Sequence, residues 1–141
     1  MNVLTAVAAL LSVVVLVGAG GGRRHLSAPL RQRITADALR LARSLGDPRP
    51  ARTARVYGPA SYKTALTAWG GGVTSPNVRK GRYYVIVVRG RFVFDGPFRS
   101  TSGTVATRLW SPTTGNNGTG LGRKLPASMS RLGRPTLIDL R

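Results

Sequence analysis

Residues 82–94 read RYYVIVVRGRFVF, and this stretch decides the fold because it is the clearest strand in the chain. It is dense in β-branched and aromatic residues, which favour extended structure. Side chains alternate between the two faces of a strand. One face carries Tyr84, Ile86, Val88, Phe92 and Phe94, and the other carries Tyr83, Val85, Val87, Arg89, Arg91 and Val93. The first face is predicted to be core, whereas the second becomes polar toward its end.

The residues after this strand indicate an antiparallel partner. Residues 95–97, DGP, end the strand, and residues 103–111, GTVATRLWS, form a second β-rich run. Turn-forming residues fill 112–118 and leave room for a further short strand. Residues 115–124, GNNGTGLGRK, fit no phosphate-binding motif and are predicted to be a flexible turn. The tail, LGRPTLIDL, contains one more extended apolar run.

Upstream, residues 27–46 have the pattern of an amphipathic helix. Ser27 is suited to cap the first turn, where Pro29 is tolerated, and Gly46 marks the end. Spacings of four and three give an apolar stripe of Leu30, Ile34, Ala38, Leu41 and Leu45. The side chains that point away from this stripe include Arg33, Arg40 and Arg43. We expect the helix to pack on the sheet and to turn these arginines toward solvent.

Two weaker elements lie between this helix and the long strand. Residues 53–57, TARVY, are a short strand candidate. Residues 60–69 form either a short helix, with Tyr62, Leu66 and Trp69 on one side, or an irregular segment. Residues 70–81 are rich in glycine and polar residues and are predicted to be a connection.

The first 22 residues carry no side-chain charge, and residues 3–17 are apolar apart from Thr5 and Ser12. An apolar helix of about 20 residues matches a bilayer core of about 30 Å. We therefore expect residues 1–22 to be a transmembrane anchor or a signal peptide, with a buried soluble helix the least favoured alternative. The predicted span includes Val3, Leu4, Leu10, Leu11 and Val17.

The side of the membrane on which the remaining chain lies is predicted less directly. Arginines that follow the span favour a cytoplasmic domain by the positive-inside rule. Small residues at 17–19 resemble a cleavage site and favour export. We expect an extracytoplasmic domain, either tethered by a single span or released by cleavage.

Charge is the most unusual property of the remaining chain. Residues 23–141 suffice for one small α+β domain with a core at about 30–141. The whole chain has 22 Lys and Arg against 4 acidic residues, for a formal net charge of +18. Codon bias in a GC-rich genome enriches arginine but does not explain the scarcity of acidic residues. Such a surface attracts polyanions. The candidate anion-binding residues are Arg23, Arg24, Arg33, Arg40, Arg43, Arg89 and Arg91.

The sequence offers no set of residues that is typical of catalysis. It has no cysteine, which excludes disulfides, thiolate chemistry and cysteine-ligated metals. Its one histidine, His25, has no carboxylate near it in the sequence, and each of the four aspartates fits an ordinary local role. No catalytic, metal-binding or cofactor-binding residue is predicted, and we expect a protein that is not an enzyme.

The order of elements resembles a known group of proteins. A leading amphipathic helix, the YYVIVVRGRFVF strand, a strand ending in LWSPTTG and the closing SRLGRPTLIDL resemble small exported or membrane-tethered actinobacterial proteins of unknown function. The resemblance covers about residues 30–141. It implies a helix packed on an antiparallel sheet, loosely similar to PepSY-like or cystatin-like α+β domains, and it implies no catalytic residue.

The functional expectation follows from charge and location. We expect a membrane-tethered or exported non-enzymatic domain whose basic surface binds anionic lipid or cell-wall polymer. The alternative is a nucleic-acid-binding protein with a cytoplasmic basic domain. The oligomeric state stays open.

Overall fold

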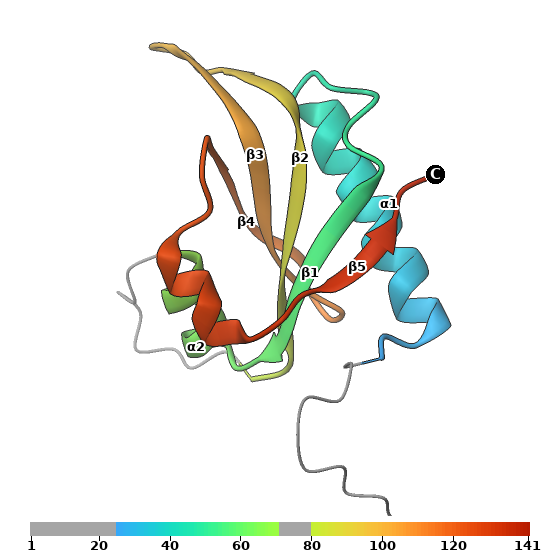
Figure 1. Cartoon of the computed structure of the whole chain (residues 1–141). Coiled ribbons are helices and arrows are strands. Elements are labelled where there is room, and N and C mark those ends of the chain that lie inside the picture. Colours follow the sequence, from blue (N-terminus) through green and yellow to red (C-terminus); the bar gives the residue numbers. More distant parts are fainter. Residues whose placement is uncertain (1–24, 71–79) are drawn as a thin grey trace, which may run out of the picture.

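The computed structural model describes residues 25–70 and 80–141 (Figure 1). The predicted span, including Val3, Leu4, Leu10, Leu11 and Val17, therefore lies outside the described residues, as do Arg23 and Arg24. The elements in chain order are α1 (Ala28–Ser44), β1 (Thr53–Ala60), α2 (Tyr62–Trp69), β2 (Tyr83–Asp95), β3 (Ser100–Ser111), β4 (Gly115–Gly122), the 3-10 helix η1 (Ala127–Leu132) and β5 (Thr136–Asp139). None of the helices in the described ranges combines the length and apolar character that a membrane span requires.

The five strands form an antiparallel sheet in the order β4-β3-β2-β1-β5, which confirms the predicted α+β class. The long strand predicted at 82–94 is β2, and it lies at the centre of the sheet. Residues 103–111 pair with it as β3, as predicted. The terminal apolar run forms β5, which pairs with β1 at one edge of the sheet.

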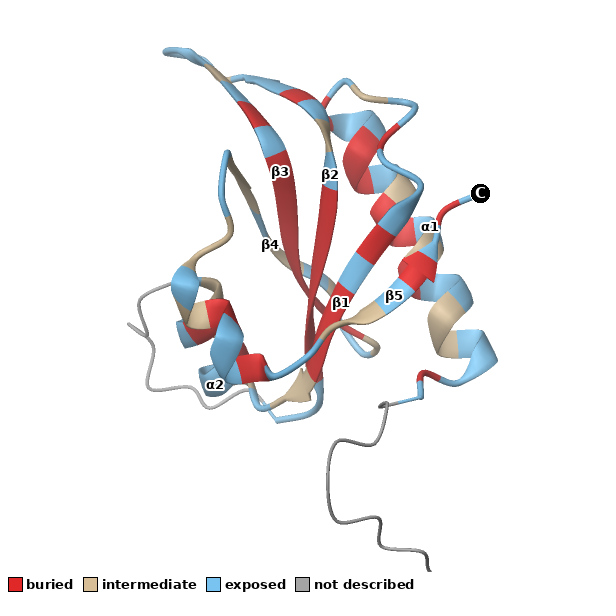
Figure 2. Cartoon of the chain, in the orientation of Figure 1, coloured by how far each residue is buried: buried red, intermediate tan, exposed pale blue. Residues whose placement is uncertain are grey.

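Helices cover both faces of this sheet (Figures 1 and 2). On one face, α1 buries Ile34, Ala38 and Leu41 against β2 and β3, as the apolar stripe predicted. On the other face, α2 and η1 pack over a second cluster. The members of this cluster on β2 are Tyr83, Val85 and Val87. Each face of β2 is therefore core over residues 83–88, so its early residues read as a continuous apolar run.

Local capping fixes the helices that form these two layers. The Ser27 Oγ accepts a hydrogen bond from the Leu30 N–H at 3.4 Å, which satisfies one free donor at the start of α1. The Ser61 Oγ accepts one from the Thr64 N–H at 3.2 Å in α2. Gly70 ends α2 with φ of 96°, a conformation that favours glycine. The short helix is confirmed over the irregular alternative.

The predicted flexible turn at 115–124 is wrong, because residues 115–122 form β4 and pair with β3. Its glycines let the indole of Trp69 lie directly on the strand. A Cβ atom at Gly118 would lie 2.7 Å from the Trp69 ring, and one at Gly120 would lie 2.6 Å from the Thr107 Oγ1. The Trp69 Nε1 also donates a hydrogen bond to that hydroxyl at 2.8 Å. A tertiary contact therefore explains glycines that resemble turn residues in the sequence.

The prediction that Phe94 is core is also wrong, whereas Phe92 is buried as predicted. Phe94 is 54% exposed because β2 and β3 continue beyond the layers that cover the rest of the sheet (Figure 2). The pairing of β1 with β2 ends at the Arg55–Val87 pair. From Phe92 onward, β2 is paired with β3 alone and forms a projecting hairpin.

Candidate anion-binding surface

Three of the predicted anion-binding residues, Arg33, Arg40 and Arg43, are exposed on α1. This helix has 17 residues and is therefore about 25 Å long. At 100° of rotation per residue, the three arginines fall on one flank of the helix, centred near Ala36. Together these four positions form what we call the α1 flank. The structure therefore brings together, along one helix, cations that the sequence places three to ten residues apart.

Arg33 is held in position at one end of the α1 flank. Its guanidinium donates a hydrogen bond from Nη2 to the carbonyl oxygen of Pro112 at 2.7 Å. The guanidinium carbon also lies 5.4 Å from the ring centroid of Trp110, within the range of a cation–π contact. These contacts link α1 to the β3–β4 turn and leave the residue exposed. Nothing local in the sequence indicates them, because the residues are 77 or more positions apart.

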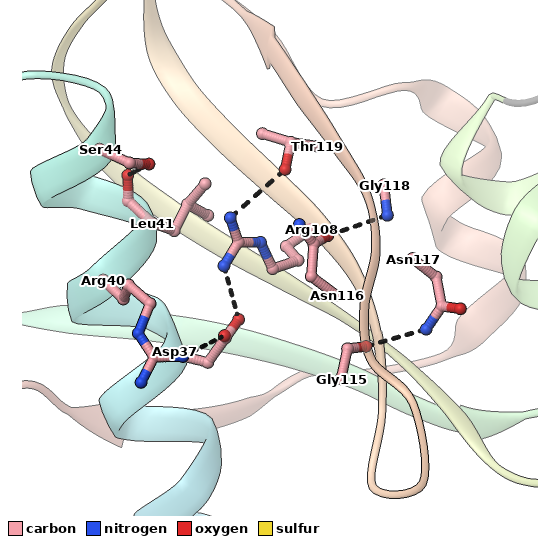
Figure 3. A network of polar contacts seen from close by, with 10 residues as sticks. All are labelled: Asp37, Arg40, Leu41, Ser44, Arg108, Gly115, Asn116, Asn117, Gly118 and Thr119. Atoms are coloured by element: carbon pink, nitrogen blue, oxygen red, sulfur yellow. Dashed lines mark hydrogen bonds and ion pairs between the residues drawn. The ribbon is translucent and has the colours of Figure 1, made fainter.

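Arg40 lies beside the one carboxylate on α1, but that carboxylate is turned inward. The Arg40 Nη1 is 4.0 Å from Asp37 Oδ1, and the Arg40 side chain is 77% exposed. Asp37 Oδ2 instead accepts a hydrogen bond from the Arg108 Nη1 at 3.0 Å, with both side chains about nine-tenths buried (Figure 3). Asp37 is therefore mainly the counter-ion of a residue on β3.

The Asp37–Arg108 pair was missed by sequence reasoning, which gave Asp37 an ordinary role on the helix. A signal was present: position 37 is three residues after Ile34 and four before Leu41, so it belongs to the buried stripe. The Arg108 Nη2 also donates to Thr119 Oγ1 at 3.4 Å, and its Nε is buried without a hydrogen-bond partner. The pair is closed off under α1 and has a structural role.

A second group of arginines gathers where α1 ends and the hairpin begins. Asp47 Oδ1 accepts a hydrogen bond from the backbone N–H of Arg49 at 2.9 Å, and Oδ2 accepts one from that of Arg91 at 2.8 Å. The predicted binding residues Arg89 and Arg91 are both exposed here. Arg43 lies in the last turn of α1, four residues before Asp47. The Asp47 carboxylate therefore links the segment after α1 to the start of the hairpin. Both of its oxygens accept hydrogen bonds from backbone N–H groups.

The two remaining aspartates are also engaged. Asp95 accepts a hydrogen bond from the Ser100 hydroxyl at 2.6 Å within the hairpin. Asp139 binds Arg52 at 3.2 Å. The backbone N–H of Arg141 and then the Arg52 guanidinium hold the pKa of Asp139 below its usual value. All four aspartate side chains thus have hydrogen-bond donors of their own.

An open cleft of about 730 Å³ lies at the start of α1. His25, Arg82 and Tyr84 are among its lining residues, and no carboxylate is among them. Burial raises the pKa of Tyr84 above its usual value of 10.0, and the nearby charge of Arg82 opposes this shift. A tyrosine that stays neutral at pH 7 acts as a hydrogen-bond donor and not as a base.

A second open groove, of about 390 Å³, lies between Trp69 and β4, with Lys124 at its edge. The Thr107 hydroxyl, which lines this groove, already accepts a hydrogen bond from the Trp69 indole. In the described part of the chain, no three histidine, cysteine or acidic side chains are grouped as a metal site requires.

Comparison of the chain with protein-family models, curated proteins and solved structures found no match. The resemblance to small actinobacterial proteins and to PepSY-like or cystatin-like domains stays a prediction. The function of the arginine surface must therefore be inferred from its own chemistry.

Proposed function

We propose that this protein is a non-enzymatic domain that binds anionic lipid head groups through the α1 flank, with acidic wall polymer as the alternative ligand. The observation that carries the proposal is the direction in which the Asp37 side chain points. Asp37 is the one carboxylate on the helix, and it is directed inward to Arg108, so that the exposed arginines are left largely without a counter-ion. Fixed cations on one flank match a layer of phosphate groups.

The expected strength of this interaction suits a tethered or peripheral domain. Each Lys or Arg near an anionic surface contributes about 1 kcal/mol, and salt reduces the contribution within a Debye length. Three arginines give about 3 kcal/mol, which is too weak for stable attachment without a second signal. The predicted membrane segment at 1–22, with Arg23 and Arg24 after it, would supply that signal in an extracytoplasmic, single-pass arrangement.

The alternatives differ in what they require of the chain. Nucleic acid binding would use the same charge, but it would need a cytoplasmic domain and base or backbone contacts along a groove. Acid–base catalysis by carboxylates would need an aspartate without a donor, and the four aspartates are held by Arg108, backbone amides, Ser100 and Arg52. Lipid binding uses the exposed cations that the α1 flank provides, together with a membrane segment as the second signal.

The test uses the full chain reconstituted into vesicles, with a fluorescent NBD label on a single cysteine. Because the chain has no native cysteine, Ala36→Cys places one probe on the α1 flank, and Ala127→Cys places a matched probe on η1, across the sheet. We expect the Ala36 probe to shift to the blue on phosphatidylglycerol vesicles at low salt. On phosphatidylcholine vesicles, and for the Ala127 probe on either lipid, we expect no shift.

Charge variants then test the residues. Arg40→Gln with Arg43→Gln removes two cations from the α1 flank, and Arg131→Gln with Arg134→Gln removes the same charge on the η1 side. At about 1 kcal/mol each, the first pair lowers the ratio of docked to undocked domain ~30-fold, and the control pair changes it little. Equal effects of the two pairs, or equal blue shifts on both lipids, contradict the proposal. Release of the domain by a DNA duplex at equal phosphate concentration supports the nucleic-acid alternative.

A further inference from the structure

The hairpin formed by β2 and β3 ends in an exposed apolar tip, which we define as residues 93–100. Large apolar side chains that are exposed number four in the described ranges, and three of them lie here: Val93 at 47%, Phe94 at 54% and Phe98 at 97% exposure. The fourth, Leu137, lies on β5 at 59% exposure. Single exposed apolar residues are common, but a group of two phenylalanines and a valine on a projecting hairpin marks an interaction site.

Backbone hydrogen bonds across the hairpin satisfy many of the polar groups near the tip, which lowers the free energy of moving it out of water. The two strands that carry it pair from the Phe92–Gly103 pair to the Asp95–Ser100 pair. The turn is closed by a hydrogen bond from the Gly96 N–H to the carbonyl oxygen of Arg99 at 3.1 Å. Backbone groups that enter a bilayer surface without partners cost several kcal/mol each. A closed hairpin avoids much of this cost, whereas an irregular loop does not.

The hairpin is also held in a fixed direction by the end of α1. The Val93 N–H donates to the carbonyl oxygen of Leu45 at 2.9 Å, and the Arg91 N–H donates to Asp47. Gly90 permits this contact, because a Cβ atom there would lie 2.5 Å from Asp47 Oδ2. The tip therefore projects as a braced element, and binding does not require it to be ordered first.

The apolar tip carries more positive than negative charge. Arg99 is exposed within it, and Arg89 and Arg91 are exposed on the strand that leads to it. Its one carboxylate, Asp95, accepts the hydrogen bond of the Ser100 hydroxyl. An apolar end with a collar of arginines matches an anionic bilayer, where the rings enter the interface and the guanidinium groups stay among the phosphates. It does not match a second copy of this chain, because the net charge of +18 repels one.

The tip and the α1 flank also belong to one side of the domain. Phe92 packs into the cluster under α1, and Phe94, two residues later, lies on the same face of β2. Figure 1 places the start of α1 and the hairpin tip at opposite ends of the fold. The α1 flank and the apolar tip therefore belong to the same face of the sheet and lie apart along it (Figure 1).

We infer that the β2–β3 hairpin inserts Phe94 and Phe98 into the interface of an anionic lipid bilayer. The inference rests on the proposed lipid binding of the α1 flank and adds an apolar insertion site to it. Acidic wall polymer offers charge but no apolar layer, so the two exposed rings favour lipid over polymer.

The test again uses the full chain with single-cysteine NBD labels. Phe98→Cys places the probe at the tip, and Leu137→Cys is the matched control at the other exposed apolar site. Leu137 alternates with buried Ile138, which faces α1, and so lies on the face away from that helix. In phosphatidylglycerol vesicles we expect a blue shift at Phe98 and quenching by lipids that carry a shallow spin label. The Leu137 probe should show neither effect.

A second variant tests the phenylalanines themselves. With the probe at Ala36, Phe94→Ser plus Phe98→Ser should lower the docked fraction, by about tenfold for each ring removed from the interface. Leu137→Ser should leave it unchanged. Both substitutions are at exposed positions, and circular dichroism verifies that each variant keeps the fold.

The outcomes separate the inference from the proposed function. An unshifted Phe98 probe, with the Ala36 probe still shifted on anionic lipid, overturns insertion and leaves head-group binding intact. Loss of the Ala36 shift as well means that the proposed function has failed. A Phe98 shift that depends on protein concentration and not on lipid assigns the tip to a second copy of the chain and overturns the inference.

Discussion

Replacing Asp37 by Asn tests how the buried ion pair supports both the fold and the charge of the surface. The substitution keeps the shape of the side chain and removes its charge. Arg108 then stays nine-tenths buried with no counter-ion, and its Nε already has no hydrogen-bond partner. Leaving one member of a buried pair uncompensated costs about 3–5 kcal/mol. Most domains of this size are stable by only about 5–15 kcal/mol, so the loss is large.

Urea unfolding of the full chain, followed by tryptophan fluorescence, measures the effect. Trp110 is a suitable reporter, because it is 3% exposed and belongs to the cluster under α1. A loss of ~3 kcal/mol with a urea m-value of ~2 kcal/mol/M lowers the midpoint by about 1.5 M. Arg40→Gln is the control, since an exposed partner at 4.0 Å contributes at most about 1 kcal/mol.

A double variant distinguishes loss of the pair from loss of packing. Asp37→Leu with Arg108→Met replaces both charges by apolar groups, and we expect much of the stability to return, because neither charge is then left buried alone. A midpoint for Asp37→Asn close to that of the unmodified chain would mean that Arg108 reaches water and that Asp37 is available to neutralise the α1 flank.

Three further predictions concern single contacts. Gly118→Ala should destabilise the fold by about 1–3 kcal/mol in the same urea assay, because its Cβ would lie 2.7 Å from the Trp69 ring; an unchanged midpoint would show that β4 shifts freely. The Asp139 carboxyl should titrate below 3.8 by NMR and move upward in Arg52→Gln. Because its pKa is lowered in the folded state, the stability it contributes is present above the unfolded pKa and is lost as pH falls through the folded one; a normal pKa contradicts this. In ultraviolet titration, Tyr84 should ionise above 10.0 because of burial, so the fold weakens as pH rises past 10.0; a Tyr84→Phe chain with the same titration curve contradicts the assignment.

The sequence predicted those elements whose causes are local. Ser27 caps the first turn of α1, and an apolar residue of the stripe through Ile34 and Leu41 recurs at every turn. The helix therefore follows from its own residues. β2 follows from its run of β-branched and aromatic side chains. The arginines of the α1 flank are exposed as predicted, since they are opposite the stripe or beside it.

What the sequence did not predict depends on distant parts of the chain. The glycines of β4 resemble turn residues in the sequence. In the fold they leave room for the Trp69 indole, which a side chain at Gly118 would contact at 2.7 Å. Phe94 continues the alternation of β2, and alternation alone does not show where the covering helix ends. Within the candidate site, the inward turn of Asp37 depends on Arg108, which is 71 residues away. The charge of the α1 flank is therefore visible in the sequence, but the inward direction of its one carboxylate is visible only in the fold.

Docking of the α1 flank on anionic lipid, as proposed above, can be measured with the NBD probe at Ala36. In the full chain on phosphatidylglycerol vesicles, the probe should shift to the blue at low salt and return as salt rises. Arg40→Gln with Arg43→Gln should abolish most of the shift, and Arg131→Gln with Arg134→Gln should preserve it. A shift that is the same on phosphatidylcholine, or that survives high salt in the α1 variant, would show that the α1 flank does not bind anionic head groups through its charge.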